Sequence, residues 1–229
     1  MTMATKRTET LEQFAASLDE HAGRSVGFAD AVRDLRIERA LKAEVDARRK
    51  TLYEALVAYH DRGVTRLSSG LVLRRTRPSP PSKRVVVDTA LVKRRYPKIH
   101  SACRVPVPYL QVRGAVAVPR WDDPGTPTGT ENVDRVADMY GRAVMPDDVK
   151  ARGEAAKELL IAAADEFGWD GLPLEFADGW AVGLRRIQFD VGVLRATHPD
   201  VAASCSVEKV SGGSAPRVYV AKPGEADVD

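Results

Sequence analysis

The sequence predicts an α+β fold, in which a long N-terminal helical, coiled-coil-like segment precedes two duplicated helix–β-hairpin–helix–strand units. The main observation is an internal repeat, because residues 87–105 (VDTALVKRRYPKIHSACRV) align without a gap with residues 189–207 (FDVGVLRATHPDVAASCSV). Helical and strand-like runs precede both copies in the same order, which indicates a duplicated unit. Both copies hold an aspartate, a proline and a cysteine at matching positions: Asp88 and Asp190, Pro97 and Pro199, Cys103 and Cys205.

The N-terminal 61 residues are expected to be helical. Residues 8–22 carry apolar side chains at helical spacing and begin at a candidate N-cap, Thr8 or Thr10. Residues 28–61 contain neither proline nor glycine. A helix of this length extends for about 50 Å, which is more than a small unit needs for its own core.

An apolar stripe along this long helix is the candidate surface for a protein partner. It comprises Leu41, Val45, Leu52, Leu56 and Tyr59, and three of these residues recur at intervals of seven. Such spacing predicts a coiled coil, formed either with residues 8–22 or with another chain, which includes a homo-oligomer. The alternative is two ordinary helices with a break near the sequence RRK.

Composition divides the chain into four expected segments. Residues 1–61 are the N-terminal helices, residues 62–117 a basic first repeat unit, and residues 118–133 an exposed linker rich in Pro, Gly and Thr. Residues 134–229 form an acidic second unit, with two helices of its own and a disordered polar tail. The first repeat differs from the second by an insertion, PSPPS, between its two strands.

The charge is divided unequally along the chain, and this is the strongest functional signal. The formal net charge is +3. Residues 62–120 nevertheless hold fourteen Lys or Arg residues and one acid, whereas residues 121–229 hold eleven basic and twenty acidic residues. Such asymmetry points to a nucleic-acid partner or to an interaction surface.

The candidate nucleic-acid-binding residues are the cations of the first repeat, because exposed cations attract phosphates with salt-sensitive affinity. The same charges could instead dock on an acidic protein surface, or be ordinary solvated side chains. The candidates are Arg74, Arg75, Arg77, Lys83, Arg84, Lys93, Arg94, Arg95, Lys98 and Arg104.

No arrangement of residues predicts catalysis, a metal site or a cofactor. The four histidines lack metal-ligand spacing, and no serine lies in a nucleophile-elbow sequence. Asp88 and Asp190 each follow a strand and precede a helix, so we interpret them as N-caps. Cys103 and Cys205 are expected to be buried, reduced strand residues rather than a disulfide. The protein is therefore not expected to be an enzyme.

Residues 28–97 resemble Gam-type host-nuclease inhibitors of phages in outline. The resemblance rests on a long charged helix followed by GLVLRRTRP and VVVDTALVKRRYP. It implies an accessory protein of phage DNA metabolism. The duplication, the acidic second unit and the PSPPS insertion depart from that pattern, so no functional residue is carried over.

Arginine outnumbers lysine 25 to 10, which is typical of a GC-rich genome such as that of an actinobacterium or its phages. That composition, with the absent catalytic chemistry, is also similar to actinophage recombination directionality factors. These proteins bind a serine integrase and switch its reaction from integration to excision.

The sequence thus predicts a non-enzymatic accessory protein that modulates a DNA-processing enzyme, a recombinase, an integrase or a nuclease, by binding it, DNA or both. The alternative is a structural or scaffolding protein that assembles through the long helix. The N-terminus has no apolar signal region, and no stretch approaches the length of about 20 apolar residues that a membrane span needs. The expected location is the cytoplasm of a host cell, with no membrane partner.

Overall fold

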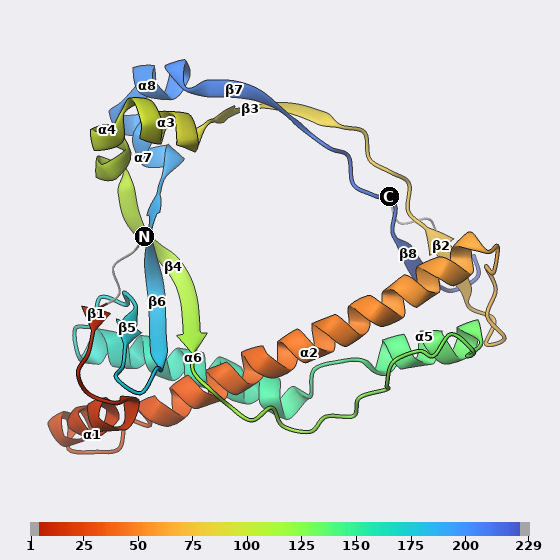
Figure 1. Ribbon diagram of the computed structural model, residues 1–229, viewed down its shortest axis with the longest axis horizontal. Coiled ribbons are helices and arrows are strands. Elements are labelled where there is room, and N and C mark those ends of the chain that lie inside the picture. The colour runs from red at the N-terminus through yellow and green to blue at the C-terminus, as the bar shows by residue number, and fades with distance from the viewer. Residues whose placement is uncertain (1–4, 225–229) are drawn as a thin grey trace. The chain divides into compact units, whose positions relative to one another are not determined.

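The computed structural model describes residues 5–224 and confirms an α+β fold with a long N-terminal helix (Figure 1). The last part of the predicted disordered tail, residues 225–229, lies outside the described residues. The first elements are β1 (Thr5–Lys6), α1 (Leu11–Ala22), α2 (Phe28–Asp61), β2 (Val72–Arg75), β3 (Ser82–Val87), α3 (Thr89–Arg95), α4 (Pro97–Ala102) and β4 (Arg104–Arg113). The remaining elements are α5 (Val133–Arg142), α6 (Asp147–Glu166), β5 (Leu174–Glu175), β6 (Ala181–Phe189), α7 (Val191–Thr197), α8 (Pro199–Ser204), β7 (Ser206–Ser211) and β8 (Val218–Ala221).

The two repeats have the same order of elements. The first runs α2–β2–β3–α3–α4–β4, and the second runs α6–β5–β6–α7–α8–β7. The β-hairpin expected in each copy is present only in the second, where β5 and β6 pair antiparallel. In the first copy that prediction is wrong, because β2 pairs with β8 and β3 pairs with β7. The PSPPS insertion explains the difference, since its prolines fix an extended backbone instead of a tight turn.

The chain forms two compact units, and each is assembled from three stretches. Unit 1 comprises residues 1–38, 83–117 and 148–209, and unit 2 comprises the rest. This division differs from the contiguous segments expected from composition. Its cause is non-local strand pairing, because β4 pairs with β6 and β2 pairs with β8.

The larger core of unit 1 packs α1 and the start of α2 against α6 and the inner ends of β4 and β6. Helix α1 begins at a capping box, in which Thr10 and Gln13 each accept a backbone hydrogen bond from the other. The Phe14 and Phe28 rings meet edge to face, with centroids 5.3 Å apart. Val112 of β4 and Val182 of β6 are buried in the same cluster. The core therefore holds one end of the β4–β6 pair.

A smaller core joins the two repeats at the other end of this strand pair, where α3, α4, α7 and α8 gather (Figure 1). The repeats contribute equivalent residues to it, Val92 with Leu194 and Cys103 with Cys205. Strand β3 of the first repeat is equivalent to β6 of the second, and β4 is equivalent to β7. Interchanging the repeats therefore converts the strand pair β3–β7 into the strand pair β6–β4. The arrangement therefore has approximate twofold symmetry.

Unit 2 packs the C-terminal part of α2 against α5 and the β2–β8 sheet. Helix α2 is continuous from Phe28 to Asp61, so the alternative of two helices with a break is wrong. Leu52 and Leu56 lie in a cluster with Val136, Met139 and other apolar residues. The whole predicted partner stripe is buried or half-buried within this chain: Leu41, Val45, Leu52, Leu56 and Tyr59. The stripe that was predicted to contact a partner is therefore covered by residues of this chain, as part of its own core.

The expected linker, residues 118–133, has no regular secondary structure but is tied to unit 2. Arg48 of α2 forms an ion pair with Asp123 at 2.8 Å, and the Tyr59 hydroxyl donates to the Glu131 carbonyl. Hydrogen bonds from the Thr128 and Glu131 backbone, with Gly129 and the Thr128 side chain, lower the pKa of the Glu131 carboxyl to about 2.

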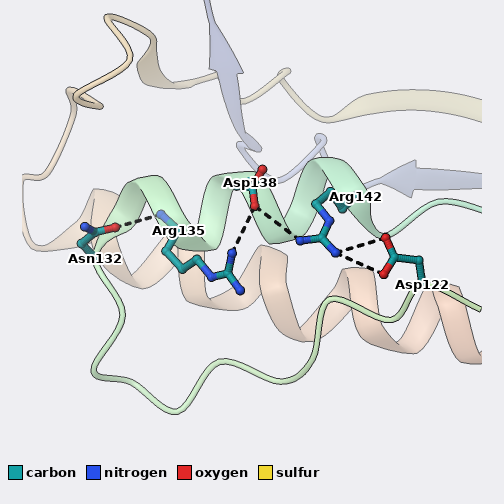
Figure 2. A network of polar contacts seen from close by, with 5 residues as sticks. All are labelled: Asp122, Asn132, Arg135, Asp138 and Arg142. Atoms are coloured by element: carbon teal, nitrogen blue, oxygen red, sulfur yellow. Dashed lines mark hydrogen bonds and ion pairs between the residues drawn. The ribbon is translucent and has the colours of Figure 1, made fainter.

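Figure 2 shows how α5 is fixed at its two ends. Asn132 caps its start by accepting from the Arg135 backbone N–H at 2.8 Å. Arg142, near its end, bonds both carboxylate oxygens of Asp122 at 3.1 and 3.2 Å and also pairs with Asp138. The charge of Arg142 is therefore neutralised by neighbouring carboxylates.

Candidate nucleic-acid interface

The basic face of the first repeat is built on the bent helix pair α3–α4. Asp88 caps α3 by accepting from the backbone N–H groups of Ala90 and Leu91 at 2.9 and 3.0 Å, as the sequence predicted. Pro97, the first residue of α4, cannot continue α3 and leaves Tyr96 in a non-helical conformation between the helices. Val92 points into the core and is fully buried. The opposite side is left to polar side chains.

Four exposed cations occupy that opposite side. They are Lys93, Arg94, Arg95 and Lys98, and we call them the α3–α4 basic face. Within residues 5–224 none of the four forms an ion pair. Arg75 and Lys83 differ, because they pair with Asp61 at 2.6 Å and with Glu208 at 2.9 Å. The charge of the basic face is thus uncompensated by contacts of its own side chains.

The second repeat shows that the fold does not require this charge. Helices α7 and α8 have the same construction, with Asp190 accepting from Gly192 and Val193 and with Pro199 at the start of α8. The bend residues Tyr96 and His198 even share backbone angles, φ −133° and −141° with ψ 61° and 64°. Yet the residues equivalent to the basic face carry no net charge: Arg195, Ala196, Thr197 and Asp200.

His100 links the basic face to the β4–β6 pair. Its ring stacks on Phe189 at the end of β6, with centroids 4.7 Å apart and planes 5° apart. Burial lowers the pKa of His100, and the positive charges of Lys93 and Arg104 lower it further. Lys93 of α3 and Arg104 of β4 therefore both act on the His100 imidazole. Arg104 is half-buried and donates to the Ile187 carbonyl at 3.3 Å.

The strand pairing adds two arginines that sequence reasoning missed. Arg185 and Arg186 of β6 lie opposite Pro108 and Val107 of β4, although they belong to the repeat that was considered acidic. The signal was present in the sequence, since at the repeat offset these two residues align with Lys83 and Arg84. A charge count along the chain misses it, because the two arginines join the basic repeat only across strand partners.

The structure distributes the predicted nucleic-acid residues over both compact units. Unit 1 holds Lys83, Arg84, Lys93, Arg94, Arg95, Lys98 and Arg104, whereas unit 2 holds Arg74, Arg75 and Arg77. Only the residues in unit 1 all belong to one part of the fold, the α3–α4 helix pair with the strands β3 and β4 attached to it. The candidate interface is therefore confined to unit 1.

Cys103 and Cys205 are free and fully buried, as expected, but they are not strand residues. Each caps the C-terminus of a short helix, immediately before β4 or β7. That position follows from the extra helices α4 and α8, which end one residue before the cysteines.

The described part of the chain holds neither a metal centre nor a membrane span. No cluster of three or more His, Cys, Asp or Glu side chains in residues 5–224 has the geometry to hold a metal ion. None of the helices in that range combines the length and the apolar character needed to cross a membrane. Comparison with protein-family models, with curated proteins and with solved structures gave no match.

Proposed function

We propose that this protein is a non-enzymatic accessory factor that binds DNA through the α3–α4 basic face and thereby modulates a DNA-processing enzyme. The observation that carries the proposal is the charge difference between the two repeats. The first helix pair holds four exposed cations, whereas the second builds the same fold with none in excess. Charge that the fold does not need is best explained by a ligand.

The physical form of the site suits a phosphate backbone. Lys93, Arg94 and Arg95 occupy the last turn of α3, where the helix dipole also favours cations. Guanidinium groups bind phosphate oxygens in a bidentate manner, and the release of counterions makes such binding sensitive to salt. Contacts of this kind position a protein on nucleic acid but do not read its sequence.

The partner enzyme is proposed as a recombinase, an integrase or a nuclease. The resemblance of residues 28–97 to phage nuclease inhibitors supports this context. Assembly through the long helix is the weaker interpretation, because the apolar stripe of α2 is taken up by the chain's own core.

The test is the salt dependence of duplex DNA binding, measured by fluorescence anisotropy with the full chain. In the variant, the triple substitution Arg94→Ala, Arg95→Thr and Lys98→Asp gives the first repeat the residues of the second. Because the second repeat accommodates these residues in the same fold, the variant is expected to fold. It should bind more weakly, and the slope of log K against log salt should fall by about 0.9 for each phosphate that the variant no longer neutralises.

A matched control removes charge elsewhere in unit 1. Lys150 and Arg152 are exposed on α6, a helix that also carries many acids, and the double substitution of both residues to alanine should leave binding unchanged. Wild-type protein that does not bind DNA but captures an acidic protein would assign the basic face to a protein partner instead.

A further inference from the structure

The outer half of the β4–β6 pair stands free of other strands. Residues 104–108 of β4 pair with residues 185–189 of β6, whereas β5 reaches only Ala181 and Val182 of β6. We call this outer half the β-ribbon. Its five residue pairs extend for about 17 Å. The strands of the ribbon carry exposed side chains on both faces, in contrast to the buried inner half.

The β4 edge of the ribbon is closed to further strands. Strand β4 lies at the edge of its sheet, and it holds two exposed prolines, Pro106 and Pro108. Proline has no backbone N–H and therefore obstructs the addition of another strand. The β4 side of the ribbon is thus not a docking edge for a peptide strand.

Both faces of the ribbon carry a cation. Arg185 and Arg186 are successive exposed residues of one strand, so their side chains point to opposite faces. The Arg186 guanidinium lies over the ring of Tyr109, 4.1 Å from its centroid. No acidic residue occurs in residues 104–113 or 181–189. A flat acidic protein surface contacts one face of a ribbon, whereas a nucleic-acid groove surrounds both.

One face also carries side chains that can bind base edges. Arg186 and Gln188 are two residues apart in β6, so they share a face, and both are exposed. Arginine pairs with the O6 and N7 atoms of guanine, and glutamine pairs with N6 and N7 of adenine, in the major groove. That groove, about 12 Å wide, admits a two-stranded ribbon.

We propose that the β-ribbon enters the major groove of duplex DNA while the α3–α4 basic face binds the adjoining phosphates. This inference rests on the proposed function and specifies its substrate. Duplex RNA is excluded on geometry, because its major groove is too deep and narrow for side chains to read. The stack of His100 on Phe189 fixes the ribbon to the basic face, so the two surfaces engage one ligand together.

The experiment compares three proteins on one labelled DNA duplex: the wild type, the double variant Arg185→Ala with Arg186→Ala, and the Lys150→Ala with Arg152→Ala control. The ribbon variant should bind about tenfold more weakly or worse, with a smaller change in salt slope than the basic-face variant because its contacts are to base edges, and the control should match the wild type. Methylation of guanine N7, which blocks the major groove, should weaken wild-type binding and have little further effect on the ribbon variant. A duplex RNA of the same sequence should compete poorly.

The outcomes separate the two proposals. Wild-type protein that fails to bind duplex DNA overturns the proposed function and the ribbon with it. If the wild type binds and the basic-face variant does not, yet the ribbon variant binds normally and N7 methylation has no effect, only the ribbon proposal is overturned. Preference for single-stranded DNA or for duplex RNA over duplex DNA would also overturn the major-groove assignment.

Discussion

The backbone N–H of Asp88 donates to the carbonyl of Cys205 at 2.9 Å, and the N–H of Asp190 donates to the carbonyl of Cys103 at the same distance. The aspartate that caps the start of each helix pair is therefore hydrogen-bonded to the cysteine that caps the end of the helix pair in the other repeat. The two copies are interlocked rather than arranged in sequence. The basic face and its neutral counterpart consequently belong to one hydrogen-bonded pair of repeats.

Loss of either aspartate cap should destabilise this construction. Asp88→Ala leaves the N–H groups of Ala90 and Leu91 without their acceptor, and it should lower the free energy of unfolding by about 1 kcal/mol. Asp190→Ala should have an effect of similar size. Urea denaturation measures both. Asp88→Asn, which can still cap, should retain most of the stability, and an equal loss in the Asn variant would refute the capping role.

The two buried thiols should be inaccessible in the native protein. Cys103 and Cys205 are 1% and 0% exposed, so neither should react with a maleimide until the protein is unfolded. Cys103→Ser or Cys205→Ser introduces a buried hydroxyl and should destabilise by about 1–3 kcal/mol. Rapid labelling of both thiols under native conditions would show that the repeat core is open.

The His100 imidazole should titrate below its ordinary pKa of 6.5, because burial and the nearby Lys93 and Arg104 disfavour its charged form. An NMR titration measures this, and Lys93→Ala should raise the pKa partway towards 6.5. Adding duplex DNA should also raise it, since phosphates favour the imidazolium. A His100 pKa that does not respond to either change would contradict the shared electrostatic site.

The same shift makes a signed prediction for stability. The unfolded state binds a proton at higher pH than the folded state, so the His100 contribution is complete above pH 6.5 and declines as the pH falls towards the folded pKa. Thermal unfolding between pH 5 and 8 should therefore show a decline that His100→Gln reduces.

Replacing a residue of the α2 stripe should affect folding rather than assembly. Leu52 is fully buried in the unit 2 core, and Leu52→Ala should lower the free energy of unfolding by about 2–5 kcal/mol with no change in oligomeric state. Lys50→Ala, at an exposed position of the same helix, is the control and should change little. Sedimentation and urea denaturation together measure both properties. Dissociation of an oligomer without loss of stability would restore the scaffolding interpretation.

Features encoded by neighbouring residues could be predicted from the sequence. The long helix begins and ends as expected at Phe28 and Asp61, because the segment contains no proline or glycine. The caps at Thr10, Asp88 and Asp190 also follow from local patterns. The internal repeat, which is also visible in the sequence, predicted that both copies have the same order of elements.

Features that depend on distant partners could not be predicted. Nothing near Val72 indicates that β2 pairs with β8, and an apolar stripe cannot tell whether its partner is another chain or α5 of the same chain. Only one half of the proposed nucleic-acid interface, the basic face, was predicted from the sequence. Its second half, Arg185 and Arg186, became visible once β6 was paired with β4.

The most direct test of DNA binding by the basic face is a reciprocal exchange between the repeats. One variant carries Arg94→Ala, Arg95→Thr and Lys98→Asp, and a second adds Ala196→Arg, Thr197→Arg and Asp200→Lys to it. The salt dependence of duplex DNA affinity is then measured for both variants and the wild type. We predict that the first exchange weakens binding and flattens the salt slope, and that the second recovers much of both, because the symmetric helix pair presents the same charges. Affinity and slope that remain at the wild-type level after the first exchange would contradict DNA binding by the basic face.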